Sequence, residues 1–151
     1  MHISARADYA VRAAIHLASV SEGPTPAEAI AEAQHIPGKF LEAILATMRA
    51  AGLVRSQRGP HGGYWLGRPA DAITVADVIR AVDGPLASVR GERPERTSYD
   101  GPSATLQQVW IAVRTNLRAV LENVTLADLA AGRLPADVRR LAAEEESWHT
   151  R

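Results

Sequence analysis

Apolar positions recur at helical spacing in three segments of the first fifty residues. The first segment follows Ser4, a candidate N-cap, and continues to about Val20. In the second, residues 25–28 (Thr-Pro-Ala-Glu) offer a cap hydroxyl, a proline for the first helical position and a capping-box carboxylate. We therefore expect one helix after Ser4 and a second, short helix over residues 26–33.

The third segment begins near Pro37 and should end at Gly52, because glycine followed by apolar Leu53 is typical of a left-handed C-terminal cap. Its apolar stripe comprises Phe40, Leu41, Ile44, Leu45 and Met48. Its opposite face carries Lys39, Glu42, Ala43 and Ala46. These mostly short side chains suit either a helix that approaches the base edges of DNA or an ordinary solvated surface, and both interpretations stay open.

A basic β-hairpin is predicted directly after this helix. Its β-prone arms are residues 53–54 and 64–66. The segment between the arms carries Arg55, Arg58 and the turn-forming residues Gly59, Pro60, Gly62 and Gly63. A glycine-rich phosphate loop would continue into Gly-Lys-Ser/Thr and a helix, which this segment does not. Three helices followed by such a hairpin is the order of a winged helix-turn-helix.

The second half of the chain begins with a capping-box pattern at Thr74 and a short helix that should end at Gly84. Residues 85–103 contain three prolines, two glycines and interleaved charges. An irregular loop of this length in a folded domain is usually either a functional loop or a linker. We interpret it as either a signal-receiving loop or a solvated linker.

Ser103 is expected to cap a long helix over residues 104–123. Apolar residues in and just after this helix are spaced alternately four and three apart, which indicates a seam that packs along another helix. That other helix is either the same helix of a second copy or the first helix of this chain. The predicted dimer seam comprises Leu106, Trp110, Val113, Leu117, Val120 and Val124. Thr125 should cap a last short helix, and residues 133–151 are expected to form a flexible tail.

Composition narrows the possible functions of these 151 residues. Hydrophobic residues make up 46% of the chain, which suits either one folded domain or one domain with an appendage. The net charge is zero, but residues 49–68 carry four arginines and no acid, so positive charge is concentrated on the hairpin. The sequence contains no nucleophile–base pair or metal motif that indicates an enzyme. It has no apolar run of membrane-spanning length and no secretory signal pattern, so we expect a cytoplasmic protein with no membrane partner.

Several motifs resemble the Rrf2 family of bacterial transcription regulators over about residues 1–132. They lie at residues 3–10, 36–42, 51–54, 58–64 and 121–129, and the wing motif Arg-Gly-Pro-His-Gly-Gly-Tyr is the most specific. The resemblance implies a homodimeric winged-helix regulator, usually a repressor, that binds double-stranded operator DNA and dimerises through its long helix.

The same resemblance implies DNA contacts in three places. The first helix would contribute Ser4, Arg6 and Tyr9, the start of the recognition helix Pro37, Gly38, Lys39, Phe40, Glu42 and Ala43, and the wing Gln57, Arg58, Gly59, His61, Gly62 and Tyr64. Arg58 would enter the minor groove, where a narrow groove concentrates negative potential. For Tyr9, a half-buried core position is an equally good interpretation.

One departure from the family concerns its sensor. Cluster-binding members carry three cysteines in the loop before the dimer helix, whereas this chain has no cysteine at all. Its five histidines also lack ligand spacing. We therefore expect no iron–sulfur cluster, no other cofactor and no metal site.

These observations predict a mainly α fold with a small β-hairpin, consisting of a winged helix-turn-helix domain plus a long dimerisation helix. The predicted divisions are the DNA-binding domain (1–69), a short helix with the loop (70–102), the dimerisation and last short helices (103–132), and the tail (133–151). The predicted function is a DNA-binding transcriptional regulator that answers a small molecule or a partner protein. An alternative is a regulatory module whose winged helix binds a metabolic enzyme, with DNA binding secondary.

Overall fold

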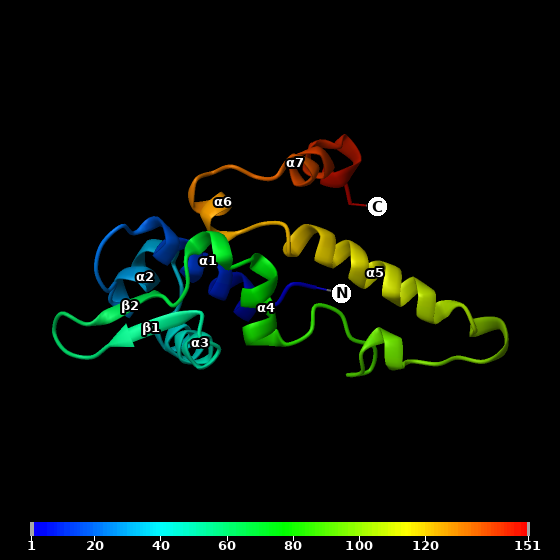
Figure 1. Ribbon diagram of the computed structural model, residues 1–151, viewed down its shortest axis with the longest axis horizontal. Helices are drawn as coiled ribbons and strands as arrows, with labels where there is room; N and C mark the ends of the chain where they lie inside the picture. The colour runs from blue at the N-terminus through cyan, green and yellow to red at the C-terminus, as the bar shows by residue number, and fades with distance from the viewer. Residues whose placement is uncertain (1, 151) are drawn as a thin grey trace.

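One long helix projects from a helical body in the computed structural model, which describes residues 2–150 (Figure 1). The body contains the first four helices, the hairpin and α6, and α5 extends away from it. The element bounds are α1 Ala5–Ser19, α2 Ala27–Gln34, α3 Gly38–Ala50, β1 Val54–Gln57, β2 Gly63–Leu66, α4 Val75–Asp83, α5 Leu106–Leu121, α6 Leu126–Ala130 and α7 Ala136–Ala143. The predicted fold class, mainly helical with one small antiparallel hairpin and a winged helix-turn-helix, is confirmed.

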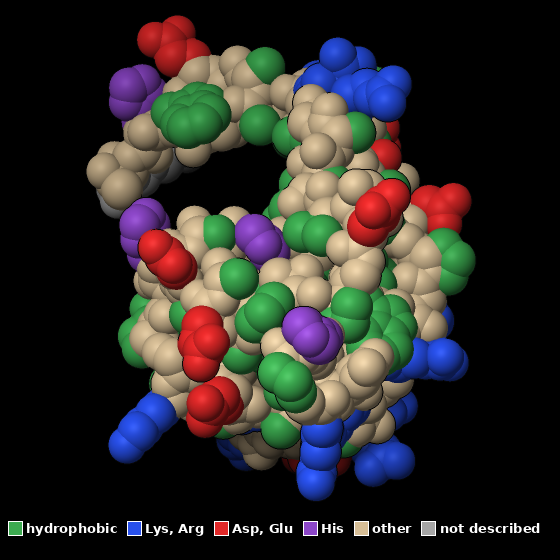
Figure 2. Space-filling view, turned by 90° about the vertical axis from the view of Figure 1, so that its left-hand side faces the viewer, with side chains coloured by type: hydrophobic (Ala, Val, Ile, Leu, Met, Phe, Trp, Pro, Cys, Tyr) green, Lys and Arg blue, Asp and Glu red, His purple; other side chains and the backbone are tan. Residues whose placement is uncertain are grey.

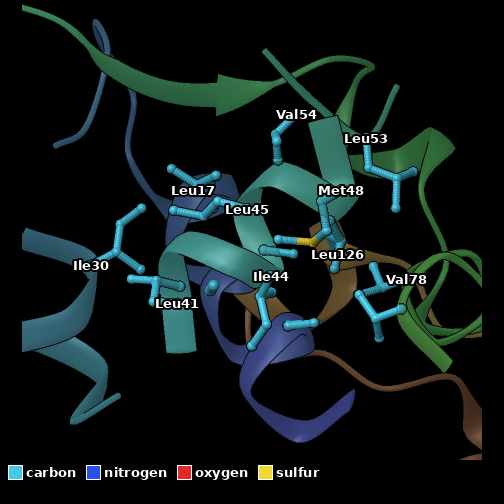
Figure 3. Packing of buried hydrophobic residues seen from close by; sticks show 14 of the residues in the cluster. Leu17, Ile30, Leu41, Ile44, Leu45, Met48, Leu53, Val54, Val78 and Leu126 are labelled. Carbon is cyan, nitrogen blue, oxygen red and sulfur yellow. The ribbon is translucent and has the colours of Figure 1, made fainter. Parts of the chain in front are cut away.

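The core forms around the apolar stripe of α3. Leu41, Ile44, Leu45 and Met48 are each at most 1% exposed and point toward side chains from α1, α2, β1, α4 and α6 (Figure 3). Phe40 differs from the other members of the predicted stripe, because 44% of its surface is exposed. Burying one face of α3 in this way leaves the face that starts with Lys39 on the outside.

The chain leaves α3 through a sharp left-handed turn. Gly52 has φ of +76°, its N–H donates to the Arg49 carbonyl at 3.0 Å, and the Leu53 N–H donates to the Met48 carbonyl at 2.9 Å. This pair of bonds is the Schellman motif, and it confirms the cap predicted at Gly52. Buried Leu53 then leads directly into β1.

The hairpin is held to the body by a third extended segment. Strands β1 and β2 pair in the register Val54–Leu66 to Gln57–Gly63, and Thr25 pairs with Tyr64 on the outer side of β2 through two N–H···O bonds of 2.8 Å. The cap predicted at Thr25 is therefore wrong. Pro26 is the N-cap of α2, without a side-chain cap, because the backbone of Thr25 is used in pairing with β2.

The capping box predicted at Thr74 and the cap predicted at Thr125 are both present, and the cap at Thr125 is also a capping box. The two caps also pair with each other, since the Val75 N–H donates to the Val124 carbonyl at 3.0 Å and the Leu126 N–H to the Ile73 carbonyl at 2.9 Å. This pairing returns the chain to the body after α5, and it buries Leu126 completely.

The segment between α4 and α5 is more ordered than an exposed linker. It contains short 3-10 turns at Pro94–Arg96 and Gly101–Ser103, and Pro94 and Thr97 are buried. Ser103 lies in the second turn, so the cap predicted there is wrong; Thr105 is the N-cap of α5 and forms no side-chain cap bond. Helix α7 lies in the segment predicted as a flexible tail and was not predicted from the sequence.

We predict that Gly63→Ala destabilises the protein. A Cβ at residue 63 would lie 2.4 Å from the carbonyl carbon of Thr25, so the backbone pair between β2 and Thr25 would have to open. We expect a loss of about 1–3 kcal/mol of unfolding free energy in urea denaturation. Gly38→Ala is the control, because nothing lies within 4 Å of a Cβ at that position. Equal stability of the two variants would contradict this account of the wing.

Candidate nucleic-acid interface

The N-terminus of α3 is open toward solvent. Its N-cap, Pro37, makes no side-chain bond to the first turn, no acidic residue lies in that turn, and no atom lies within 4 Å of a Cβ built on Gly38. The free N–H groups and the helix dipole therefore favour an anion, such as a phosphate, in front of the helix. Lys39, Glu42 and Ala43 are all exposed beside this end, so the structure brings the predicted recognition-helix residues together.

Phe40 is packed against α1 and not in the core. Its ring meets that of Tyr9 edge to face, with centroids 5.5 Å apart, and the Arg12 guanidinium lies 5.3 Å from the centre of the Tyr9 ring. Arg12 also pairs with Asp8 at 3.0 Å and donates to the Gln34 carbonyl at the end of α2. Tyr9 is half-buried in this cluster, so it braces α1 against the start of α3.

Ser4 and Arg6 are engaged in bonds within the body. The Ser4 hydroxyl accepts from the Ala7 N–H at 2.9 Å, which confirms it as the N-cap of α1, and donates to Asp83 at the end of α4. Arg6 donates to the Thr47 hydroxyl at 2.8 Å and so connects α1 to the last turn of α3. Arg6 therefore helps to position α3, whereas Ser4 joins the start of α1 to the end of α4.

The wing presents its side chains on a tight turn. The Gly62 N–H donates to the Gly59 carbonyl at 3.0 Å, and a Cβ on Gly62 would lie 2.1 Å from the Gln57 carbonyl oxygen, so only glycine fits there. Gln57, Arg58 and His61 are exposed on this turn or at its base. The backbone of Tyr64 is taken up by Thr25, and its side chain is half-buried.

Two further arginines share this side of the molecule. Arg49, exposed at the end of α3, donates to the Ser56 hydroxyl of β1 at 3.1 Å, and Arg55 is exposed on β1. Neither arginine was among the predicted site residues. Both lie in the acid-free stretch 49–68, whose concentration of arginines was the feature of the sequence that could have identified them. In Figure 2, Lys and Arg side chains lie along the lower edge of this end of the molecule, where Figure 1 places β1 and α3, while acidic groups gather on its left side.

Part of the predicted seam faces the chain's own body across an open groove, whereas Val124 lies after the end of α5 and is buried in the body, so it is not available to a partner helix. Val113, Leu117 and Val120 line it from α5, opposite Ala7 and Ile79, and the cavity volume is about 700 Å³. The helix contains no buried residue along its length. Intramolecular packing against the first helix therefore does not fill the seam, and the structure leaves half-buried apolar side chains on it.

An open helix N-terminus beside a basic hairpin on a three-helix body defines a winged helix-turn-helix DNA-binding module. The chain belongs to the Rrf2 family, because residues 3–132 match the family model described as an iron-dependent transcriptional regulator. Members of this family are transcriptional regulators and not enzymes.

Named relatives and solved structures agree with this assignment. The chain is 47% identical over 154 aligned positions to the HTH-type regulator Rv1287 of Mycobacterium tuberculosis, covering 99% of this chain and 96% of that protein. The structure of CymR, the global cysteine regulator of B. subtilis, has a TM-score of 0.74 and 37% identity, covering 87% of this chain and 98% of CymR. The structure of T. potens IscR has a TM-score of 0.69 and 32% identity, covering 100% and 93%.

The iron named in the family description does not fit the side chains of this chain. The loop that precedes α5 offers no thiolate, because the sequence contains no cysteine. Among residues 2–150, no group of three or more His, Asp or Glu side chains is arranged to hold a metal ion. Across the same residues, no helix is both long and apolar enough to cross a membrane.

Proposed function

We propose that the protein is a homodimeric, sequence-specific DNA-binding regulator, acting as a repressor at a pseudo-palindromic operator. The observation that carries this proposal is the exposure of an open α3 N-terminus together with an acid-free basic wing that follows the same helix directly. The first element suits the major groove and the second the minor groove or phosphate backbone, which is how winged helices contact a duplex.

The residues at this surface would have two roles, base recognition at the start of α3 and general DNA binding at the wing. Lys39, Glu42 and Ala43 would lie nearest to base edges and discriminate between operators, because they surround the open end of α3. Arg58 would act as a general clamp, since a guanidinium on a narrow turn is drawn to the concentrated negative potential of a minor groove. The Tyr9–Phe40 contact and the Arg6–Thr47 bond would keep α3 at its angle.

The second copy would be held through α5. An apolar stripe with a repeat of 3.5 residues suits packing along another helix, and an apolar groove left open in a single chain favours a partner that fills it. Two winged modules joined in this way can contact two half-sites about one helical turn apart. Binding of such a dimer would block transcription until a signal at the segment between α4 and α5 changes its geometry. We place no iron–sulfur cluster in this control step.

The first test is selection of genomic fragments by the purified protein, followed by affinity measurements on the selected operator at several salt concentrations. A sequence-specific regulator enriches discrete sites and binds them with a steep salt dependence. No enrichment over random fragments, or capture of a partner enzyme with salt-independent DNA binding, would contradict the proposal and favour the protein-binding module.

We predict that Arg58→Ala weakens operator binding about tenfold and reduces the slope of log affinity against log salt by about one. The reason is the loss of one cation from the wing with little loss of packing, because Arg58 is exposed. Fluorescence anisotropy with a labelled operator measures both quantities. Arg139→Ala in α7 is the matched control, and an equal effect of the two changes would remove Arg58 from the interface.

We predict that Leu117→Glu converts the dimer to a monomer in sedimentation equilibrium. The change places a carboxylate in the apolar groove beside Val113 and Val120, where burial by a partner helix would be costly. Thr115→Glu introduces the same group at an exposed position of α5 and should leave the dimer intact. A Leu117→Glu protein that stays dimeric would show that the seam is not the interface.

A further inference from the structure

We propose that a pocket between α4, the segment after it and α5 binds a small organic polyanion, and that this pocket is the effector site. The proposal rests on the proposed function, which supplies the DNA binding that an effector would control. The pocket has a volume of about 450 Å³, within the range of small-molecule sites. Its lining includes four arginines from three elements: Arg80 of α4, Arg93 of the segment after it, and Arg114 and Arg118 of α5.

The arginines of the pocket outnumber the carboxylates that pair with them, of which Glu95 lines the pocket and Glu122 lies outside its lining. Glu122 pairs with Arg80 and, at 3.0 Å, with Arg118, while Glu95 pairs with Arg114. Four guanidinium groups thus face two carboxylates, an excess of two positive charges. Arg93 forms no salt bridge within residues 2–150, although it lies close enough to Glu95 to help lower the pKa of that carboxyl.

Both carboxylates are charged at neutral pH, because hydrogen bonds hold their pKa values below the usual range. Hydrogen bonds from Arg80 and Arg118 lower the pKa of Glu122. A backbone hydrogen bond, followed by the side-chain bond from Arg114, lowers the pKa of Glu95. Protonation at neutral pH therefore does not change the charge balance, and the excess positive charge is a permanent feature that an anionic ligand can compensate.

The segment that carries Arg93 and Glu95 is fixed in place by one side chain of α5. The Gln107 amide donates to the carbonyls of Pro94 at 3.4 Å, Glu95 at 3.2 Å and Thr97. The side chain of Pro94 is buried, and the Thr97 hydroxyl donates to the Pro94 carbonyl at 2.7 Å. The pocket wall is thereby preorganised, which reduces the entropy that a ligand would lose on binding.

The lining indicates the chemistry of the ligand. Planar guanidinium groups bind carboxylate and phosphate oxygens in pairs, and such charge-assisted bonds are the stronger kind. Pro85, Leu86 and Ala87 add an apolar side to the pocket, so an organic anion is favoured over a bare ion. DNA is not the expected occupant, because the pocket lies between α4 and α5, and the wing projects from the body on the side away from α5 (Figure 1).

Occupancy of this pocket would reach the DNA-binding surface through α4. An anion that joins Arg80 to Arg93 and Arg114 would fix α5 relative to α4. Helix α4 packs on both α1 and α3, and Asp83 at its end accepts a hydrogen bond from Ser4, the cap of α1. Since α5 would set the separation of two recognition helices in a dimer, its angle would couple the ligand to operator affinity.

The test measures binding of two probes, citrate and inorganic pyrophosphate, to the full chain by calorimetry at constant ionic strength without DNA. We expect at least one probe to bind with one site per chain. Preference for citrate would indicate a carboxylate ligand and preference for pyrophosphate a phosphorylated one. Arg93→Gln and Arg114→Gln should each weaken binding about tenfold.

Arg96→Gln is the matched control, because Arg96 lies on the same segment but outside this pocket and is highly exposed. Circular dichroism checks that each variant is folded, and Arg93→Gln keeps the test valid if loss of the Arg114 pair disturbs the fold. Failure of both probes to bind would overturn the proposed site. If Arg96→Gln weakened binding as much as Arg93→Gln, the probes would be attracted by net charge alone, and the site would also be overturned.

Operator affinity with and without the better probe separates this proposal from the proposed function. We expect a change of about fivefold or more in the unmodified protein and none in Arg93→Gln. Normal operator binding that does not respond to a bound probe would overturn the effector role and leave the DNA-binding function standing. A probe that binds to a protein without operator affinity would support the pocket and refute the proposed function.

Discussion

Four side chains of α3, Leu41, Ile44, Leu45 and Met48, lose almost all contact with water, and each contributes about 1.5–3 kcal/mol through this burial. Because they occupy one face of the helix, the opposite face is forced outward, and the neighbouring helices and β1 take their positions around the buried side. The exposure of Lys39 and Glu42 is thus a consequence of packing. The surface proposed to bind DNA exists because of the core beneath it.

Local signals in the sequence predicted most of this architecture. Helical spacing located the buried face of α3, and the caps at Ser4, Gly52, Thr74 and Thr125 were all correctly identified, because each depends on a few neighbouring residues. The cap at Thr25 failed for the opposite reason. Its backbone pairs with Tyr64, nearly forty residues away, and no pattern around Thr25 reveals that contact.

For the candidate sites too, local sequence patterns did not reveal contacts between residues that are far apart in the sequence. The wing could be located from its glycines and arginines, but Arg6, Tyr9 and Ser4 proved to be joined to Thr47, Phe40 and Asp83 across the body. Such contacts depend on how helices cross. The segment between α4 and α5 was predicted to be an irregular loop. The hydrogen bonds of the Gln107 amide and the salt bridge between Arg114 and Glu95 give it a defined shape.

The turn at Gly52 has a consequence for how the two proposed DNA contacts relate to each other. Its two hydrogen bonds and the buried Leu53 leave no hinge between α3 and β1, and the Arg49–Ser56 bond crosses the same junction. Helix α3 and strand β1 are therefore joined without a flexible linker. A DNA duplex that contacts both the helix and the wing would have to deform to fit them. The stiffness of the base pairs between the two contacted grooves would then contribute to operator selection, even though no side chain contacts those base pairs.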